Sequence, residues 1–535
     1  MPPPTEDTGQ RAGLTRRALV AATAGLARPA LAGDVRARTL RFVPHAPLRW
    51  LDPTFWPFLE TRNHAMMVYD TLYGIDGQGR VQPQMALGHS VAEDGRTWRI
   101  RLRPGLVFHD GTPVLARDCV ASILRWAEHV MMGRSLLSVT DELLAPDDST
   151  IVFRLSRRFP MLAAALGDRA MQICAIMPAR LADGTPQQTI SEVVGSGPFR
   201  FLDDEYDGGQ EAAYARHTFY VPRPDGVASF TAGPKLVHFD RVEWHAMPGP
   251  EQALAALKSG AVDWWESPLP PDHGAIAEDP RLVLKLHDRA GYMGTMRFNH
   301  LTFPFNSPAL RRAVLRATDQ AAFMAAATGA DRMQWRSGVG FFCPQSPMAS
   351  RDGMPEASLT PGAGRDAIRA AGYGGERIVV LAAGDLPAVR AMAEVGSAFL
   401  TQLGFNVQTL LPNLRDMLPR LLRTQPAGAG GWNVAFGYWS GHDFWNPGMH
   451  RYLRGDGLAG EVGWPTSERL EAMRRAWLVT PDMAGQEAIA ADMQLRAFED
   501  VPYVPLGQWV RPTAHAADLS GMLDGFPLFW NLRRG

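Results

Sequence analysis

The sequence predicts an α/β protein with more than one sheet. Short runs typical of strands alternate with amphipathic helical runs along the whole chain. The 52 glycines and 42 prolines are scattered as turns rather than gathered in a linker, which favours lobes built from interleaved segments. At 535 residues the chain has the length of roughly three domains of ~150 residues.

The elements follow from local apolar patterns. The first expected strand is 39–43, which Pro44 ends, and apolar spacing then predicts a helix over 61–72. Alternation predicts a strand at 98–102, and the next helix, 117–129, has one apolar side. The remaining expected strands are 151–155, 199–202, 236–244, 294–299, 378–381, 407–410 and 434–438. The remaining expected helices are 250–257, 308–318, 388–403, 467–477 and 484–499.

Composition excludes some classes of partner. The formal net charge is -1, so there is no electrostatic case for binding nucleic acid or an anionic membrane. Cys119, Cys174 and Cys343 form no CxxC and no zinc spacing. We expect them to be buried small apolar residues rather than disulfide partners.

Residues 1–32 have the parts of a cleaved signal peptide. Arg16 and Arg17 precede a weakly apolar run, 19–26, and Ala30-Leu31-Ala32 forms an A-x-A exit. The paired arginines indicate a twin-arginine signal, and a Sec signal that contains two arginines is the alternative. The run is shorter than the ~20 residues that span a bilayer. We expect a soluble mature protein outside the inner membrane.

Residues 100–122 form the most informative stretch of the chain. They read as a strand, a Pro-Gly turn, a short strand, an Asp-Gly turn and a helix start. Asp110-Gly111 supplies the positive φ of a tight turn, and Asp118 falls in the first helical turn, where a carboxylate is favoured. Further along, Gly195 and Gly197 permit backbone that a Cβ would forbid.

This stretch resembles the signature of the family 5 extracellular solute-binding proteins of ABC importers, the dipeptide, oligopeptide and nickel type. Where family members usually have Thr, this chain has Leu115, so the hydroxyl cap of the helix is missing. Other segments are similar to family motifs in the same order, namely Leu51-Asp52-Pro53, Tyr69-Asp70-Thr71-Leu72, Gly195–Phe199, 256–263, 298–319 and 501–506.

The resemblance implies a two-lobe periplasmic-binding-protein fold, type II-like, with the ligand in the interlobe cleft. Lobe I would comprise 33–72, 195–288 and 508–535, its extra subdomain 73–194, and lobe II 289–507. Such a protein is a monomer of the periplasm that captures a solute by lobe closure and delivers it to an inner-membrane ABC permease complex. We expect a peptide or peptide-like, amine-bearing solute; metal chelates, sugars and opines remain open.

The richest candidate ligand site is the aromatic segment 431–447. Its strand delivers Tyr438 and Trp439 to a loop that carries His442, Asp443 and Trp445. In peptide-binding relatives, a Trp here is followed by an Asp that holds the ligand's amino terminus, and the equivalent is His442 or Asp443. Asp443 would favour a cationic amine, whereas His442 would favour an anionic or neutral ligand.

Residues outside this segment are also candidates. His45 and Trp50 follow the first strand, and the carboxyl ends of strands are where open α/β sheets bind ligands. Asn299 and Tyr292 begin the second lobe and could face the cleft, and Trp264-Trp265 is a further aromatic pair. Ordinary core packing is the alternative for these aromatics.

Metal binding and catalysis find little support. His442 and His450 share a segment, but loop histidines eight apart define no coordination set and no HExxH is present, so we expect no metal and no cofactor. The chain has no GxSxG and no P-loop, so we assign no catalytic residue. A secreted hydrolase is the alternative from a different class, and a sensor that presents its ligand to a receptor would use the same fold.

Overall fold

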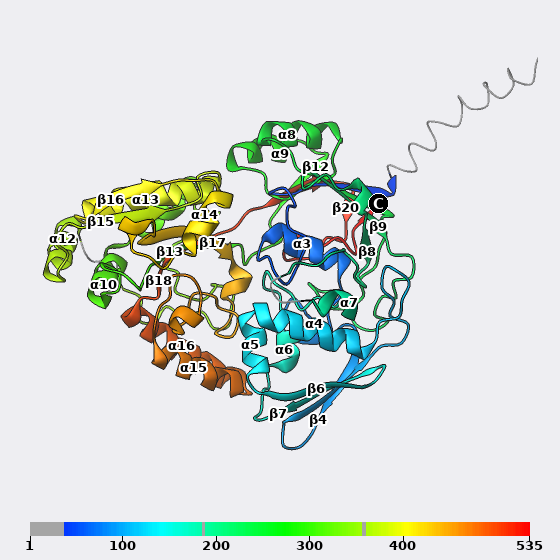
Figure 1. Cartoon of the computed structure of the whole chain (residues 1–535). Helices are drawn as coiled ribbons and strands as arrows, with labels where there is room; N and C mark the ends of the chain where they lie inside the picture. Colours follow the sequence, from blue (N-terminus) through cyan, green and yellow to red (C-terminus); the bar gives the residue numbers. More distant parts are fainter. Residues whose placement is uncertain (1–36, 185–187, 356–359) are drawn as a thin grey trace, which may run out of the picture.

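A computed structural model describes residues 37–184, 188–355 and 360–535 (Figure 1). The expected signal peptide, 1–32, lies outside these residues. Within the described ranges, no helix combines the length and the apolar character needed to cross a membrane.

The first large sheet has seven strands in the order β12-β19-β11-β1-β10-β9-β8. These are β1 (Thr39–Val43), β8 (Phe199–Phe201), β9 (Glu211–Arg216), β10 (Arg241–His245), β11 (Trp264–Trp265), β12 (Leu282–Lys285) and β19 (Thr513–Ala516). β1 runs parallel to β10 and β11, with Phe42 opposite Trp264. The carboxyl ends of β1 and β11 therefore meet at one edge. Phe529 and Trp530, near the end of the chain, belong to the core beneath this sheet.

A four-stranded antiparallel sheet, in the order β4-β5-β7-β6, forms a separate unit. Its elements are β4 (Ala86–Val91), β5 (Thr97–Leu102), β6 (Thr140–Asp147) and β7 (Thr150–Leu155), with helices α4 (Ala116–His129), α5 (Met131–Leu137) and α6 (Leu162–Leu166). Gly111 has φ +85°, which confirms the predicted turn. The N-cap Leu115 makes no side-chain cap, and Asp118 instead accepts a 2.8 Å hydrogen bond from the Leu115 N–H.

The second large sheet has six strands in the order β14-β18-β13-β17-β15-β16. They are β13 (Tyr292–Phe298), β14 (Trp335–Arg336), β15 (Arg377–Leu381), β16 (Asn406–Leu410), β17 (Val434–Ser440) and β18 (Tyr503–Trp509). The helices of this region are α10 (Pro308–Ala317), α11 (Gln320–Thr328), α12 (Pro361–Ala370), α13 (Pro387–Gln402), α14 (Leu414–Leu421), α15 (Glu468–Val479) and α16 (Met483–Asp500). α13 packs on β16 and β17, and α11 packs on β18.

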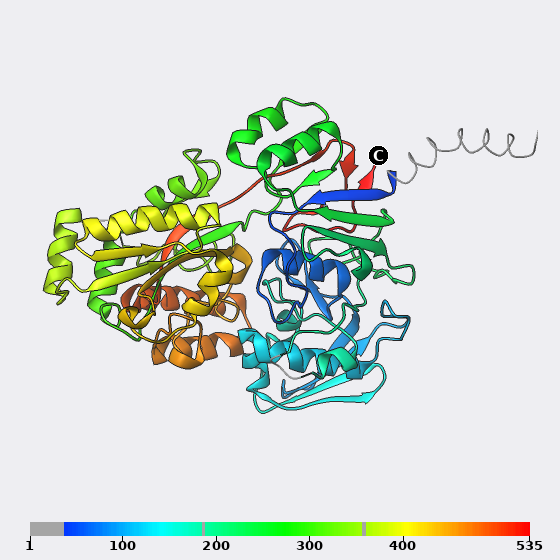
Figure 2. The same cartoon turned by 45° about the horizontal axis from the view of Figure 1, so that its top comes forward.

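The chain crosses between the two large sheets twice (Figure 2). Residues 286–291 join β12 to β13, and residues 510–512 join β18 to β19. The four-stranded unit also packs against the second half, because one hydrophobic cluster contains Ile100 and Trp126 together with Phe341 and Phe444. In both views this unit lies beside α15 and α16.

Two predicted elements need correction. The helix expected at 61–72 is α3 (Leu59–Val68), because the chain turns extended at Tyr69 and the buried Asp70 then pairs with Lys235 at 2.8 Å. The strand expected at 236–244 begins only at Arg241. The Leu236 carbonyl, ahead of it, accepts a hydrogen bond from the Asn531 N–H instead of a strand neighbour.

The two glycines of the 195–199 turn lie against the end of α3. A Cβ on Gly195 would lie 2.1 Å from the carbonyl oxygen of Val68, and one on Gly197 would lie 2.6 Å from that of Met67. The predicted steric need for glycine is confirmed, and its cause is close backbone approach rather than a positive φ.

Candidate functional site

A cavity lies where the two crossovers meet α3, and we call it the crossover cavity. It encloses about 580 Å³, including space open to solvent. Each wall contributes a side chain: Arg62 from α3, Glu266 after β11, Asp288 and Arg511 from the crossovers, Tyr292 at the start of β13, and Phe526 from the C-terminal segment. The cavity therefore combines buried charges with aromatic surface at the junction of the two large sheets.

Arg62 is a buried cation in the cavity wall, with only 2% of its surface exposed. Its guanidinium carbon lies 3.7 Å from the centre of the Phe526 ring. Nη1 donates to the Ser440 hydroxyl at 3.4 Å and Nη2 to Oδ1 of Asn63 at 3.3 Å, both long bonds. Among the described residues, Nε has no hydrogen-bond partner and no carboxylate lies within 4 Å. Burial lowers the pKa of Arg62, and a guanidinium stays charged at neutral pH.

Glu266 is already neutralised by His45. Oε2 of Glu266 lies 2.8 Å from Nδ1 of His45 and accepts the His45 backbone N–H at 2.8 Å, while Oε1 accepts from Asn63 at 3.2 Å. Burial on its own would lower the pKa of His45, but Glu266 and Glu60 outweigh it and raise that pKa well above its usual value. His45 is therefore a cation, and the pKa of Glu266 lies below its ordinary range despite burial, because His45 stabilises the carboxylate.

Asp288 contacts His442, one of the predicted ligand residues. Nε2 of His442 lies 3.3 Å from Oδ1 of Asp288, which also accepts the Ala290 N–H at 3.0 Å. The ring of His442 stacks near Phe230 and Trp445, with centroids 5.4 and 5.9 Å away. Burial lowers the pKa of His442 and outweighs the effect of Asp288, so His442 is neutral at pH 7.

Arg511 lies at the partly exposed rim of the crossover cavity. Its guanidinium carbon is 5.3 Å from the centre of the Tyr292 ring, within cation–π range. Tyr292 in turn contacts the ring of Tyr438, at a centroid distance of 5.4 Å. In the part of the chain that the structure describes, Arg511 forms no ion pair.

Asp443 faces a different, second cavity. This cavity is lined by the polar side chains of His129, Asp168, Gln172, Asp443 and Arg451, with apolar side chains around them. Asp443 is 2% exposed; its Oδ1 accepts the Met171 N–H at 3.2 Å, and its Oδ2 has no partner among the described residues. Burial raises the pKa of Asp443 to about 6. Burial, and less strongly the charge of Asp443, raises that of Asp168 to about 7.

An arginine guanidinium packs over the ring of each of the two tryptophans in the predicted segment. Arg451 lies 4.4 Å from the centre of Trp439, and Arg169 lies 3.8 Å from that of Trp445. Both rings are partly exposed and also pack against a hydrophobic core cluster. They remain candidate ligand contacts.

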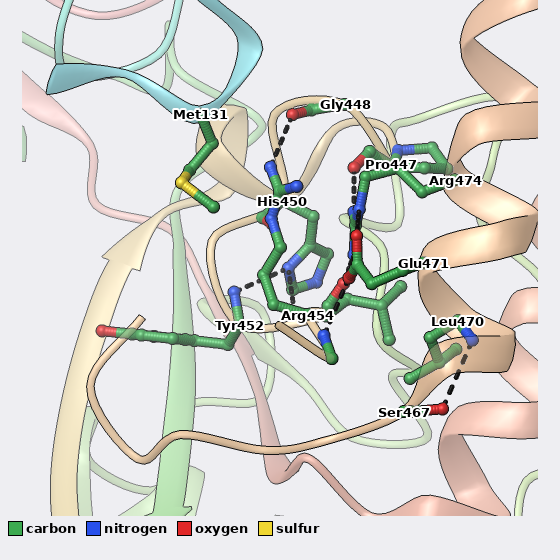
Figure 3. Close-up of polar contacts among 12 residues, drawn as sticks. Met131, Pro447, Gly448, His450, Tyr452, Arg454, Ser467, Leu470, Glu471 and Arg474 are labelled. Atoms are coloured by element: carbon green, nitrogen blue, oxygen red, sulfur yellow. Dashed lines mark hydrogen bonds and ion pairs between the residues drawn. The ribbon is translucent and has the colours of Figure 1, made fainter. Parts of the chain in front are cut away.

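Residues 447–454, which follow Asp443 and Trp445 in the chain, are held by a buried polar network (Figure 3). His450 accepts two backbone N–H groups at Nδ1, 3.2 and 3.0 Å away, and burial lowers its pKa to about 3. Arg454 donates to the His450 carbonyl, and Arg474 pairs with Glu471 at 2.8 Å. His450 is thus a neutral structural residue. Across the described ranges, no three His, Cys, Asp or Glu side chains are placed to hold a metal ion.

None of the eight predicted site residues lines the crossover cavity itself. His45, His442 and Tyr438 lie one contact behind it, each touching a residue that does. Asp443 lines the second cavity. Of the further candidates, Tyr292 and Trp264 do line the crossover cavity.

Besides Trp439 and Trp445, two predicted residues lie elsewhere. Trp50 stacks on Trp56 with ring centroids 4.2 Å apart. Asn299 is fully buried, and its Nδ2 donates to the Trp432 carbonyl at 3.1 Å. The structure brings neither of them to the two cavities.

Sequence reasoning missed Arg62, Glu266, Asp288 and Arg511. The signal for Glu266 was available, because it follows β11 just as His45 follows β1, and the two strands are parallel. Asp288 and Arg511 lie in the two crossovers, which no local sequence pattern distinguishes from ordinary loops.

Three comparisons bear on this site. Residues 80–457 match the model of the bacterial extracellular solute-binding proteins, family 5. The chain is 33% identical, over 89% of each sequence, to a probable peptide ABC transporter periplasmic-binding protein of Sinorhizobium fredii. Its fold matches AgaA of A. tumefaciens, solved with agropinic acid, with TM-score 0.76, 22% identity and coverage of 93% and 99%. It also matches DppA of Helicobacter pylori, solved with the peptide STSA, with TM-score 0.77, 20% identity and coverage of 94% and 99%.

Proposed function

Because the chain belongs to the family 5 bacterial extracellular solute-binding proteins, we propose that it is the periplasmic component of an ABC importer for peptides or peptide-like solutes. The main structural support for this function is the crossover cavity, which lies between the two large sheets and is lined by buried charged side chains. The name of the Sinorhizobium relative supports a peptide and a periplasmic location. In this role the protein captures the solute and delivers it to an inner-membrane permease, and it catalyses no reaction.

We propose that 33–72, 195–288 and 510–535 form lobe I, 73–194 its extra subdomain, and 289–509 lobe II. The last boundary differs from the expected 507 because β18 continues in the second large sheet to Trp509. The two crossovers support a hinge between them. Contacts across the division, from Arg451 to Gln172 at 3.1 Å and from Met171 to Asp443, are ones that opening would break. A solute that binds the closed form more tightly would shift the population toward it.

Asp443 is the amine anchor in this proposal. Its buried Oδ2 lacks a partner within the described chain, and a protonated amine would supply both a hydrogen bond and a countercharge. His442, the alternative anchor, is neutral and already contacts Asp288. Ser440, which precedes the short η4 turn (Gly441–Phe444), lines the crossover cavity, and Asp443 within the turn lines the second cavity, so both cavities adjoin this turn.

Mass spectrometry of the solute that co-purifies with protein isolated from the periplasm tests this function. We expect intact peptides or other amine-bearing solutes after release by denaturation. A sugar or an amine-free chelate would overturn the peptide assignment and leave the transport role in place. Cleavage of added peptides by the purified protein would overturn the transport role.

A further inference from the structure

The second cavity brings together two buried carboxyl groups from opposite sides of the proposed lobe division. Asp168 belongs to the extra subdomain and Asp443 to lobe II, and the two residues are 4% and 2% exposed. Oδ1 of Asp168 accepts the Ala170 N–H at 2.9 Å, and Oδ1 of Asp443 accepts the Met171 N–H at 3.2 Å. Oδ2 of each carboxyl group has no hydrogen-bond partner among the described residues. Each group therefore leaves one buried oxygen without a donor from this part of the chain.

The neighbouring cations do not pair with either carboxyl group. Arg451, the cation in the cavity lining, forms an ion pair with Glu461 at 2.7 Å. Arg62 and Arg169 act on the two groups only from further away, because within the described ranges neither has a carboxylate oxygen within 4 Å. Two facing carboxylates in a buried site disfavour each other's charge, and one shared proton removes a charge and supplies the missing donor.

Two other titratable side chains lie close to the pair. His129, at the end of α4, lines the same cavity, and its ring centre is 5.2 Å from that of Phe55. Burial raises the pKa of Cys174 far above neutral, so this thiol keeps its proton. The raised pKa values of Asp168 and Asp443, about 7 and about 6, show that the carboxyl pair changes its charge near neutral pH. His129 is the side chain from which a test must separate this pair.

Opening of the lobes would separate the two carboxyl groups. The hydrogen bond from Met171 to Asp443 crosses the division, and so does the contact from Nε2 of Gln486 to the sulfur of Met161 at 3.3 Å. Once these contacts part, water reaches both carboxyl groups and restores their ordinary tendency to ionise. The proton-binding strength of the pair therefore differs between the open and the closed protein.

We propose that Asp168 and Asp443 share a proton when the lobes close without a solute, so that acidification closes the ligand-free protein and a higher pH opens it. Asp168 carries the proton and donates it to the free oxygen of Asp443. Asp168 is thus a positioning residue, which acts on the solute through Asp443, and a solute amine competes with the proton for that oxygen. The inference rests on the lobe closure of the proposed function and is independent of which solute is bound.

The test is the distance between the lobes in ligand-free protein, followed by fluorescence energy transfer. Leu144→Cys on β6 and Met483→Cys on α16 place one dye on each side of the division, at positions that are 42% and 53% exposed. The three native cysteines are buried, so the dyes attach to the introduced ones. Solute is removed by unfolding, dialysis and refolding, and the protein that retains its co-purified solute gives the reference signal of the closed form.

We expect the ratio of closed to open protein to fall at least tenfold between pH 5 and pH 8. The pKa of Asp168 is higher in the closed form, so closure is favoured below about pH 7 and is lost as the pH rises through that value. Asp168→Asn leaves one buried carboxyl group and should move the midpoint at least one pH unit lower. Asp168→Asn with Asp443→Asn should give the same ratio at pH 5 and pH 8, whereas His129→Gln should keep the native profile.

The outcomes separate the proposal from the function on which it rests. A ligand-free protein whose closed fraction is the same at pH 5 and pH 8 would overturn the shared proton, even if a variant fails to fold. A pH dependence that persists in the double variant, or that His129→Gln removes, would also overturn it. An identical signal with and without the co-purified solute at every pH would instead refute the lobe closure of the proposed function, and the inference with it.

Discussion

Replacing Asp443 by Asn should stabilise the ligand-free protein at neutral pH and weaken its binding of amines. Asp443 is buried, and its pKa rises from 3.8 to about 6 on folding because burial disfavours the carboxylate. The folded state therefore binds the proton more tightly than the unfolded state. The stability that this proton gives is fully present below pH 3.8 and is lost as the pH rises through about 6.

The size of the effect follows from this shift. A rise of the pKa from 3.8 to about 6 corresponds to about 3 kcal/mol, at 1.36 kcal/mol for each pKa unit. Linkage gives a stabilisation of about 3 kcal/mol at pH 7.5 and about 1 kcal/mol at pH 4.5 for Asp443→Asn. At about 2 cal/mol/K per residue, this raises the Tm by about 3 °C at pH 7.5 if the whole chain unfolds as one unit. Release of Asp168 from the neighbouring charge acts in the same direction.

Differential scanning calorimetry of ligand-free protein at pH 7.5 and 4.5 measures this effect. Asp352→Asn, which removes the same charge from an exposed position, is the control and should leave the Tm unchanged at both pH values. A Tm for Asp443→Asn that falls below that of the native protein at pH 7.5, or a gain that does not depend on pH, would refute the reasoning. It would mean that the Asp443 carboxylate is paired rather than isolated in the folded protein.

Three further changes should alter stability in defined ways, each measured by thermal unfolding. Gly195→Ala places a Cβ 2.1 Å from a carbonyl oxygen and should cost ~1–3 kcal/mol or more, whereas Gly88→Ala, with nothing within 4 Å, should cost much less. Lys235→Met leaves the buried Asp70 without its cation and should cost ~3–5 kcal/mol; adding Asp70→Asn should recover part of the loss. His45→Gln should destabilise most near pH 6 and progressively less as the pH rises through the raised pKa of His45. The reason is that a raised pKa contributes stability only while the imidazole is protonated in the fold.

An element with a clear apolar period could be predicted from the sequence, whereas the fully buried strand β18 could not. The helix expected at 117–129 is α4 (Ala116–His129), because its polar and apolar sides differ. β18 (Tyr503–Trp509) is buried at all seven positions, so it shows no alternation and was not assigned as a strand. Uniform burial also explains why Arg62 was missed. Every side chain of α3 is buried, so the helix has no exposed face whose polar pattern would distinguish a functional residue from the others.

Three of the predicted site residues, His45, His442 and Tyr438, lie one contact from the crossover cavity, whereas Trp50 and Asn299 do not. His45 was found because strand ends collect ligand residues, and it contacts Glu266 at the next strand end. Asp288 and Arg511 are 223 positions apart and meet only because both crossovers pass the same cavity. A single sequence contains no information about which residues of the two crossovers lie close together in the fold.

The interleaving of the first large sheet also determines when it can form. β1 lies near the start of the chain and β19 near its end, yet both belong to one sheet, and Trp530 completes its core. The second sheet takes all its strands from the continuous stretch 292–509. A chain emerging from the ribosome can therefore assemble the second sheet while the first still lacks a strand and part of its interior. Completion of the first sheet must wait until β19 and Trp530 have been synthesised, so the sheet that contains β1 is completed only after the second sheet can form.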